Sequence, residues 1–302
     1  DLALAGGVNI VVPQKSGYIY NDNSIFSEDG NVRPFDEDAN GTVFSNGIGC
    51  VVLAKKSWAE QTGRQYYARI LASSVNNDGA QKASFLSPSI KGQVECITQA
   101  YSAASIVPRE ISFIETHGTG TSVGDPIEVA SLNRVFQNKN CNNEKHCALG
   151  AIKGNLGHMD RAAGVAGFIK VCLSLHHRCI PPVAQYMKSN KMLELEKTPF
   201  YINTEPVKLT DECSLAGITA LGVGGTNVHM VLASRNRKMI KKSEYSKYYI
   251  LPLSAHAKEV LMELVDSMKT YLEKYDGDMD NVESTLQLYR RSYSERVAIV
   301  CN

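Results

Sequence analysis

Two glycine-rich turns, each holding one histidine between a strand-like run and a helix-like run, constrain this chain more than any other feature of its sequence. The first turn is Glu115-Thr-His-Gly-Thr-Gly-Thr121, and it follows a short apolar run. The second is Ala151-Ile-Lys-Gly-Asn-Leu-Gly-His-Met-Asp160, and it follows another predicted strand. Glycine lets a backbone approach a ligand closely. The turns therefore predict a site at which His117, Lys153 and His158 face a bound molecule.

These three side chains suit a carbonyl oxygen that becomes negatively charged. A neutral imidazole donates one N–H, so two imidazoles that converge on a thioester oxygen would stabilise an enolate as it forms. Lys153 would orient the neighbouring groups or alter their pKa values. A third glycine-rich turn, Leu221-Gly-Val-Gly-Gly-Thr-Asn-Val-His229, would complete the floor of the site, with the backbone N–H of Val223 donating to a tetrahedral oxyanion.

Structural roles compete with these functional ones. A single histidine after a strand is often a hydrogen-bonding residue of the loop, and we favour a structural role for His229, on the strand that leaves the third turn. Asp125 and Glu128 resemble a catalytic carboxylate pair. Asp125 is also well placed as a helix N-cap, with Pro126 at the first helical position and Glu128 where a capping-box acid belongs. We therefore assign both acids to the start of a helix.

Charge and cysteine usage argue against several classes of function. The net charge of +1 gives no argument for binding nucleic acid or an anionic membrane surface. No apolar run approaches the roughly 20 residues of a membrane span. The eight cysteines are scattered without a CxxC pair. We therefore expect neither a metal site nor a disulfide framework, and the reduced cytoplasm is the expected compartment.

The composition changes at Ser234, where the basic stretch 234–248 is typical of a solvated linker. Residues 249–302 predict the start of a small second α/β unit. In it, Ser254 is expected to cap an amphipathic helix. The apolar face of that helix would comprise Leu261, Leu264, Val265, Met268 and Leu272.

The three turns resemble the signatures of β-ketoacyl synthase domains in their residues, order and spacing. The resemblance covers residues 1 to about 233 and extends to three shorter motifs: Arg33-Pro-Phe-Asp36, Asn76-Asn-Asp-Gly79 and Gly124-Asp-Pro-Ile-Glu128. Gly157-His-Met-Asp160 is similar to the corresponding stretch in modular polyketide synthases and hybrid polyketide–peptide assembly lines. The resemblance implies three parts: 1–233, the C-terminal portion of a ketosynthase domain; 234–248, the linker; and 249–302, part of the flanking subdomain that follows such domains.

The resemblance implies a thiolase-like fold with α-β-α-β-α layers, of which this chain would hold mostly the second half, and a homodimer. It also implies a reaction. A cysteine takes an acyl chain from the phosphopantetheine arm of an acyl carrier protein, and malonyl-carrier protein then loses CO2 to give an enolate that attacks the acyl thioester. No cofactor would be bound directly.

Residue by residue, the resemblance makes His117 and His158 the catalytic histidines and Lys153 their supporting residue. It places Val223 at the gate of the acyl pocket, with its N–H in the oxyanion hole. The residues expected beside the gate and the substrate are Gly222, Gly224, Thr119, Thr121, Asn155 and Leu221.

The chain departs from the family pattern at the nucleophile. No cysteine in it stands in the family's Cys-Ser-Ser type turn, which would precede a strand matching residues 1–7. The stretch 1–12 reads as a buried strand interrupted by glycines, so we expect a preceding segment that carries the cysteine, on another chain or missing from this sequence. Without that segment we expect no activity and no independent folding. Smaller departures are Gly154 in place of Thr or Ser, Leu221 in place of Phe, and Arg161 in place of a small residue.

Three functions are open at this point. The first is the C-terminal part of a condensing ketosynthase. The second is a non-condensing scaffold that binds a carrier protein or a partner domain. The third is a decarboxylating or chain-transferring variant. Retention of both histidines and Lys153 favours the first, because only chemistry requires all three.

Overall fold

The computed structural model describes residues 2–14, 16–22, 24–80, 88–137, 144–209, 214–235, 248–288, 290 and 292–301. The chain divides into two compact units. The first comprises Asp1–Lys55 and Tyr66–Asn236, and the second Lys56–Gln65 and Arg237–Asn302. Each unit is described by itself. Most of the predicted linker, residues 236–247, lies outside the described residues.

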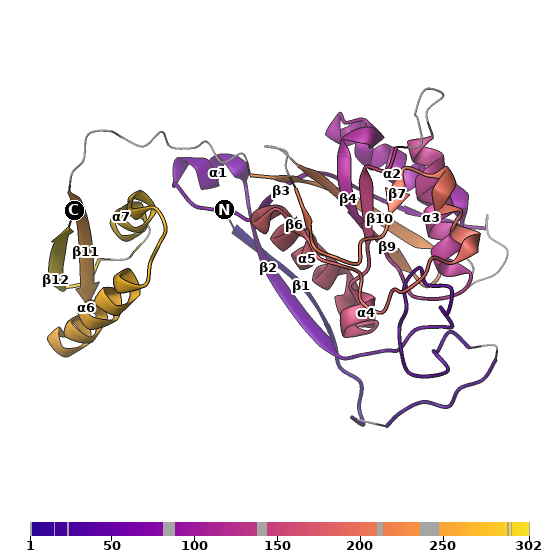
Figure 1. Cartoon of the computed structure of the whole chain (residues 1–302), viewed down its shortest axis with the longest axis horizontal. Helices are drawn as coiled ribbons and strands as arrows, with labels where there is room; N and C mark the ends of the chain where they lie inside the picture. The colour runs from indigo at the N-terminus through magenta and orange to yellow at the C-terminus, as the bar shows by residue number, and fades with distance from the viewer. Residues whose placement is uncertain are drawn as a thin grey trace. The chain divides into compact units, whose positions relative to one another are not determined.

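A six-stranded sheet forms the centre of the first unit, in the order β3-β10-β9-β4-β5-β7 (Figure 1). Its strands are β3 (Ala68–Asn77), β4 (Ile111–Glu115), β5 (Cys147–Gly150), β7 (Phe200–Tyr201), β9 (Leu215–Gly222) and β10 (Thr226–Ser234). Strands β9, β4, β5 and β7 run parallel, whereas β10 is antiparallel to both β3 and β9. Strands β4 and β5 are almost wholly buried, as parallel strands covered on both faces must be.

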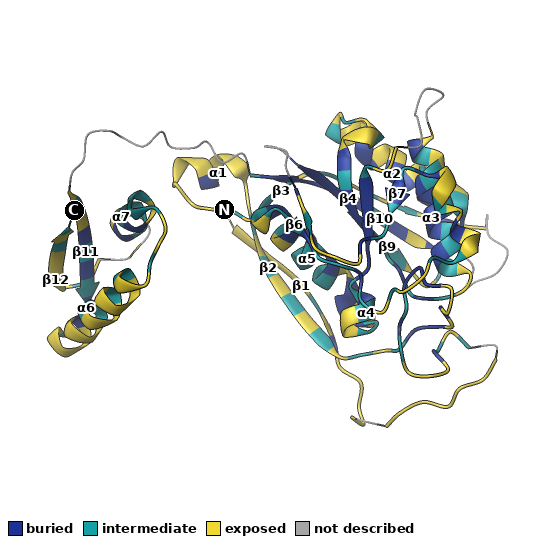
Figure 2. Ribbon diagram, viewed as in Figure 1, coloured by how far each residue is buried: buried dark blue, intermediate teal, exposed yellow. Residues whose placement is uncertain are grey.

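Helices cover both faces of this sheet (Figure 2). On one face, α2 (Ile90–Ala104) and α3 (Gly124–Phe136) pack together and enclose a core that includes Ile97 and Leu132. On the other face lies α5 (Ala163–His177), whose Val171 belongs to a second core. The two cores bury opposite sides of the same strands, which fixes the sheet between the helices.

A two-stranded hairpin packs against the far side of α5. It consists of β1 (Leu2–Asn9) and β2 (Gly47–Ala54), paired antiparallel over their whole length. The approach is close: a Cβ at Gly49 would meet Val165 Cγ1 at 2.7 Å. The described residues thus form four successive layers, α2/α3, sheet, α5 and hairpin, and the predicted layered α/β fold of thiolase type is confirmed in them.

The prediction of a buried, interrupted strand over 1–12 is wrong. Strand β1 runs without a break through Gly6 and Gly7, and most of it is exposed. A Cβ at Gly6 would meet the backbone of β2, and a Cβ at Gly7 would meet the backbone at Arg161. Its outward face carries large apolar side chains: Leu4 is 75% exposed, and its cross-strand neighbour Val52 is 64% exposed. Apolar composition alone therefore does not predict that a strand is buried, because burial also requires another layer to cover it.

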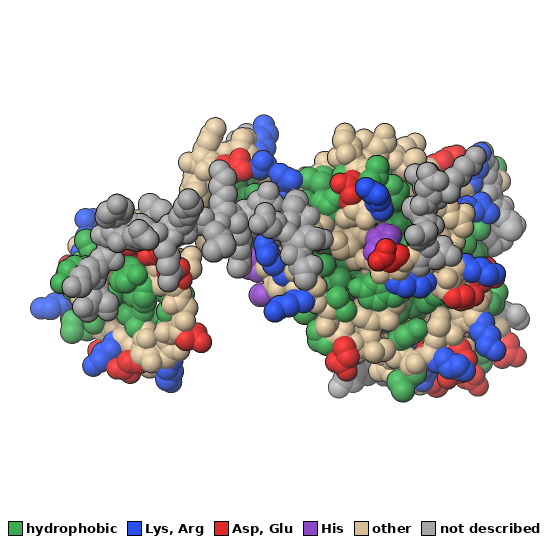
Figure 3. All heavy atoms as spheres, turned by 45° about the horizontal axis from the view of Figure 1, so that its top comes forward, with side chains coloured by type: hydrophobic (Ala, Val, Ile, Leu, Met, Phe, Trp, Pro, Cys, Tyr) green, Lys and Arg blue, Asp and Glu red, His purple; other side chains and the backbone are tan. Residues whose placement is uncertain are grey.

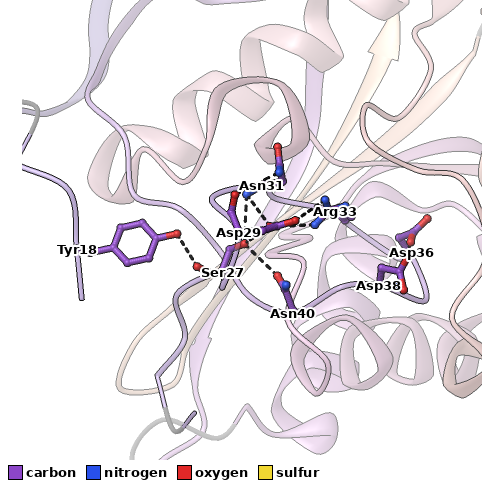
Figure 4. Close-up of polar contacts among 8 residues, drawn as sticks. All are labelled: Tyr18, Ser27, Asp29, Asn31, Arg33, Asp36, Asp38 and Asn40. Atoms are coloured by element: carbon purple, nitrogen blue, oxygen red, sulfur yellow. Dashed lines mark hydrogen bonds and ion pairs between the residues drawn. The ribbon is translucent and has the colours of Figure 1, made fainter. Parts of the chain in front are cut away.

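The segment between β1 and β2 is a long loop held by polar contacts (Figure 4). Ser27 Oγ lies 2.9 Å from Asp29 Oδ1 and 3.0 Å from Asn40 Oδ1. Arg33 forms an ion pair with Asp29 at 2.6 Å, and this guanidinium holds the pKa of that carboxyl well below its usual range. The network shapes the loop up to Gly41, where it reaches the cavity described below.

Short elements connect the larger ones. They are η1 (Pro108–Glu110), α4 (Lys153–Leu156), η2 (Asp160–Ala162), β6 (Cys179–Ile180), η3 (Lys191–Leu193), η4 (Leu195–Lys197) and β8 (Val207–Lys208). Strands β6 and β8 pair antiparallel with each other. In the described part of the chain, no helix combines the length and apolar character that crossing a bilayer requires.

The second unit is a small α/β structure, and it also includes residues 56–65, which the sequence-based division placed in the 1–233 part. It contains α1 (Lys56–Gln61), β11 (Tyr249–Ala255), α6 (Lys258–Glu273), α7 (Met279–Leu288) and β12 (Glu295–Cys301). Strands β11 and β12 pair antiparallel, and the predicted apolar face of α6 packs into their core. The predicted cap is wrong: Ser254 lies within β11, and Ala257 is the N-cap residue of α6, with no side-chain cap bond.

Candidate active site

The three glycine-rich turns meet because of the order of the strands. They follow the carboxyl ends of β4, β5 and β9, and these parallel strands are neighbours in the sheet. Residues at the carboxyl ends of adjacent parallel strands share one edge, where α/β proteins bind their ligands. A cavity of about 710 Å³ lies at this edge, and His117, Lys153, His158 and Val223 are among the residues that line it. On the face of the molecule drawn in Figure 3, apolar, basic and acidic side chains lie interspersed on the surface of the first unit.

His117 is held on several sides. Its backbone N–H donates to Glu128 Oε1 at 2.7 Å, and its carbonyl accepts a close bond from Lys153 Nζ. On the ring, Nδ1 accepts the backbone N–H of Leu221 at 3.3 Å. A neutral imidazole that accepts at Nδ1 carries its proton on Nε2. Strand β9 therefore sets the tautomer of His117 and makes Nε2 the donor.

His158 has the same proton arrangement. The backbone N–H of Asp160 donates to its Nδ1 at 3.0 Å, which again leaves the proton on Nε2. The ring stacks on Phe44 with centroids 5.0 Å apart, and its backbone pairs with Val43 and Ser45 in the long loop. The loop before β2 thus fixes the orientation of this ring.

The two imidazoles lie close together and remain neutral. Their ring centroids lie 5.5 Å apart at an interplanar angle of 83°. Burial, with the Lys153 ammonium as a smaller cause, lowers the pKa of His158 to about 4. Burial, followed by Lys153 and His158, holds the pKa of His117 well below its ordinary value. Near neutral pH the site therefore presents two uncharged N–H donors.

Lys153 lies close to the two rings and is only 4% exposed. Burial lowers its pKa, whereas Glu128, Glu115 and Asp125 oppose that effect. Its ammonium joins the turn after β5 to the turn after β4 through the carbonyl of His117. Lys153 thus holds the two histidine turns together in the structure.

Asp125 and Glu128 do not cap the helix, so the helix-cap assignment is wrong. Helix α3 begins at Gly124 after Val123, with no side-chain cap bond from Val123. Glu128 instead accepts the N–H groups of His117 and Gly118, and Asp125 accepts those of Phe35 and Gly120. Burial raises the pKa of Asp125 to about 6 and that of Glu128 to about 7. Asp125 and Glu128 therefore hold the His117 turn in place. The sequence does not show this role, because an acidic residue early in a helix is equally consistent with a helix cap.

The third turn is the tight connection between β9 and β10. Gly224 and Gly225 have φ values of 97° and 99°, which only glycine adopts readily. Val223 stands between Gly222 and Gly224 at the rim of the cavity, and its side chain is 74% exposed. Asn227 anchors the turn by donating to Asp78 Oδ1 at 2.7 Å.

Of the other residues expected beside the gate and the substrate, all but one line the cavity. Thr119, Thr121, Leu221, Gly222 and Gly224 line the cavity. Asn155 is exposed on α4 and is not among the lining residues.

His229 is fully buried on β10, where Nδ1 lies 3.0 Å from Thr219 Oγ1, which agrees with the structural role favoured for it. No cysteine is among the described residues that line the cavity. The described residues also contain no group of three or more His, Cys, Asp or Glu side chains that could hold a metal ion.

The fold and the site together define a thiolase-like protein with a donor site built on three glycine-rich turns. Comparison with known families agrees. The beta-ketoacyl synthase N-terminal domain matches residues 1–59, the beta-ketoacyl synthase C-terminal domain matches 67–187, and the ketoacyl-synthetase C-terminal extension matches 189–300. The chain therefore belongs to the β-ketoacyl synthase family.

Its relatives include polyketide synthases. The chain is 34% identical to polyketide synthase PksN of Bacillus subtilis and 35% identical to one component of the phenolphthiocerol/phthiocerol polyketide synthase of Mycobacterium tuberculosis. Each match covers 99% of this chain, but only 6% of the first relative and 20% of the second.

Solved ketosynthases have the same fold. Ketosynthase twelve of the bacillaene synthase of Bacillus amyloliquefaciens matches with a TM-score of 0.80 and 35% identity over 99% of this chain and 52% of that chain. The ketosynthase from module 1 of the bacillaene synthase of Bacillus amyloliquefaciens matches with a TM-score of 0.77 and 36% identity, over 99% and 53%. The chain thus spans about half the length of these ketosynthases.

Proposed function

We propose that this chain supplies the enolate-stabilising part of a ketosynthase site that extends an acyl chain by decarboxylative Claisen condensation. The observation that carries the proposal is the position of the two imidazole protons. A backbone N–H donates to Nδ1 of both His117 and His158, so each ring, within the cavity wall, carries its donor on Nε2. Two neutral donors close to each other suit an oxygen on which negative charge develops.

The proposed reaction breaks one carbon–carbon bond and forms another. The malonyl thioester loses CO2, and the electron pair of the broken bond moves into the thioester to give an enolate. The Nε2–H groups of His117 and His158 would hold the enolate oxygen. The enolate carbon then bonds to the carbonyl carbon of an acyl group on a cysteine, and the cysteine sulfur leaves as a thiolate.

The nucleophile would come from outside the described cavity wall. No described residue that lines the cavity is a cysteine, so we propose that a ketosynthase N-terminal segment supplies it and that the chain is inactive without that segment. Both substrates would arrive on the phosphopantetheine arm of an acyl carrier protein, with Val223 at the gate. No directly bound cofactor is proposed, and a homodimer is expected from the family.

We also propose the organisation that the sequence predicts. Residues 1–233 would form the ketosynthase portion and 249–302 part of the flanking subdomain, joined by 234–248. The free cysteines among the described residues support the reducing cytoplasm as the compartment.

Reconstitution tests the proposal. The full chain is combined with a ketosynthase N-terminal segment that carries the cysteine, and CO2 release from malonyl-carrier protein is measured beside acyl loading by intact mass. We expect His158→Ala to lower decarboxylation by about two to three orders of magnitude, because one donor to the oxyanion is lost, while acyl loading persists. The matched control is His177→Ala, at the end of α5 and outside the cavity wall.

The outcomes separate the three functions. Normal elongation by His158→Ala would refute the role of that ring. Carrier binding with neither loading nor CO2 release indicates the scaffold. CO2 release without a condensed product indicates the decarboxylating variant.

A further inference from the structure

The carboxylate of Glu115, the last residue of β4, connects three segments around the site. Glu115 is 1% exposed and forms part of the cavity wall. Its Oε1 accepts the N–H of Ile152, the residue before Lys153, at 2.6 Å. Its Oε2 lies 2.7 Å from Lys170 Nζ on α5. The segment that carries His117, the turn that carries Lys153 and the helix behind them therefore meet at one side chain.

Two glycines make room for this carboxylate. A Cβ at Gly150 would lie 2.7 Å from both Glu115 Oε2 and Phe113 Cε2, and a Cβ at Gly167 would lie 3.1 Å from Ile218 Cδ1 and 3.3 Å from Glu115 Cγ. Neither glycine has a positive φ, so the backbone conformation does not require them. Glu115 is therefore one of the two side chains for which Gly167, in the small-residue helix α5, leaves space; the other is Ile218.

Lys170 completes a buried ion pair. Its side chain is 10% exposed, and its ammonium lies 5.9 Å from the centre of the Phe113 ring. Among the ion pairs of the described residues, this is the one in which both side chains are at most 10% exposed. An isolated charge at this depth would be costly, so the two groups depend on each other.

We propose that Glu115 and Lys170 form a positioning pair that holds the Lys153 turn against the His117 turn and balances the charge around the Lys153 ammonium. This inference rests on the proposed function, because it assigns the pair to the same site. Neither side chain needs to touch the substrate. The pair acts through Ile152 and Lys153, whose ammonium contacts the carbonyl of His117.

The two members of the pair act on Lys153 in opposite directions. Burial is the main cause that lowers the pKa of Lys153, and Lys170 lowers it further. The groups that oppose this are Glu128, Glu115 and Asp125, while His117 and His158 are the neutral rings close to the same ammonium. Removing Lys170 should therefore raise the pKa of Lys153, and removing the charge of Glu115 should lower it.

This opposition gives a test that does not need activity. The full chain, labelled at the lysine ε-carbon, is combined with an unlabelled ketosynthase N-terminal segment so that the site is folded, and the Lys153 signal is identified by its loss in Lys153→Arg. We expect the pKa of Lys153 to rise in Lys170→Met, fall in Glu115→Gln and return near the wild-type value in the double variant. General loosening of the fold would admit water and raise the pKa in both single variants.

The control pair is Lys91 and Glu95, an exposed i,i+4 pair on α2 with a separation of 3.9 Å. Lys91→Met and Glu95→Gln should leave the Lys153 titration unchanged. Equal changes in these controls, or changes of the same sign in both buried single variants, would overturn the proposal. If a single variant fails to fold, the double variant remains testable, because Gln at 115 can still accept the N–H of Ile152.

Activity supplies the second arm. In the reconstituted ketosynthase, each single variant should lower kcat for malonyl decarboxylation by about tenfold or more with little change in KM, and the double variant should recover part of the loss. Additive losses with no recovery would contradict the pairing. If the wild-type protein releases no CO2, the proposed function fails, whereas the lysine titration still decides whether the pair acts on Lys153.

Discussion

Acid should destabilise the first unit through His229, a histidine that lies outside the cavity. It is fully buried, its one side-chain hydrogen-bond partner among the described residues is the Thr219 hydroxyl, and no carboxylate compensates a charge on its ring. Burial lowers its pKa from 6.5 to about 3. Between the two pKa values the imidazole is protonated in the unfolded chain but neutral in the folded chain. The free energy of unfolding therefore falls as the pH drops below the pKa of the unfolded chain, 6.5.

The magnitude follows from the two pKa values. At about pH 7.5 the ring is neutral in both states and has no effect, whereas at about pH 5 the unfolded ring is charged and the folded ring is not, which lowers the free energy of unfolding by about 2 kcal/mol. His229→Gln removes the titration and should abolish that part of the loss. Urea unfolding of the full chain, reconstituted with the ketosynthase N-terminal segment, is followed by circular dichroism at the two pH values and measures the difference.

Two controls make the result interpretable. Trp58, the single tryptophan of this chain, belongs to the second unit, so with a tryptophan-free N-terminal segment its fluorescence identifies the transition of that unit separately. His177→Gln alters an exposed histidine and should leave the pH dependence as in the wild type. An equal loss of stability between the two pH values in wild type and His229→Gln would refute the reasoning.

Three further predictions concern packing and the site. The outward face of the hairpin should drive self-association, so replacing the cross-strand neighbours Leu4 by Lys and Val52 by Glu should shift sedimentation towards the monomer; unchanged association would contradict this. Gly49→Ala should lower the free energy of unfolding by about 1–3 kcal/mol, because its Cβ would clash with α5. Gly164→Ala, whose Cβ would meet Ala220 Cβ at an ordinary contact distance of 3.9 Å, should be neutral or stabilising by up to about 1 kcal/mol. Glu128→Ala should cost about 2–3 kcal/mol in urea unfolding, since two buried backbone N–H groups lose their acceptor, and Glu128→Gln should cost less.

The site residues that can be predicted from the sequence are those whose positions follow from nearby elements of the chain. His117 and the Lys153–His158 turn each follow a strand directly, and two strand–turn–helix units in succession predict parallel neighbours whose turns share an edge. The predicted second unit has the same basis, because the apolar spacing of α6 is visible within 16 residues. Such features need no knowledge of distant contacts.

The failures all depend on distant contacts. A carboxylate at the start of a helix is equally suited to capping and to holding a loop, and only the fold shows that Glu128 reaches the His117 turn. Whether β1 is exposed depends on the layers that pack against it, and the apolar sequence of the strand does not predict those layers. Ser254 is a plausible cap by composition, but the strand before α6 extends past it.

The bond from the N–H of Leu221 to His117 has an evolutionary consequence. Every amino acid except proline carries that N–H, so the proton on the ring is positioned by a group that almost no codon change can remove. The same holds for Asp160 and His158. A substitution of the side chain at 221, such as Leu to Phe, therefore leaves the group that positions the proton of His117 in place.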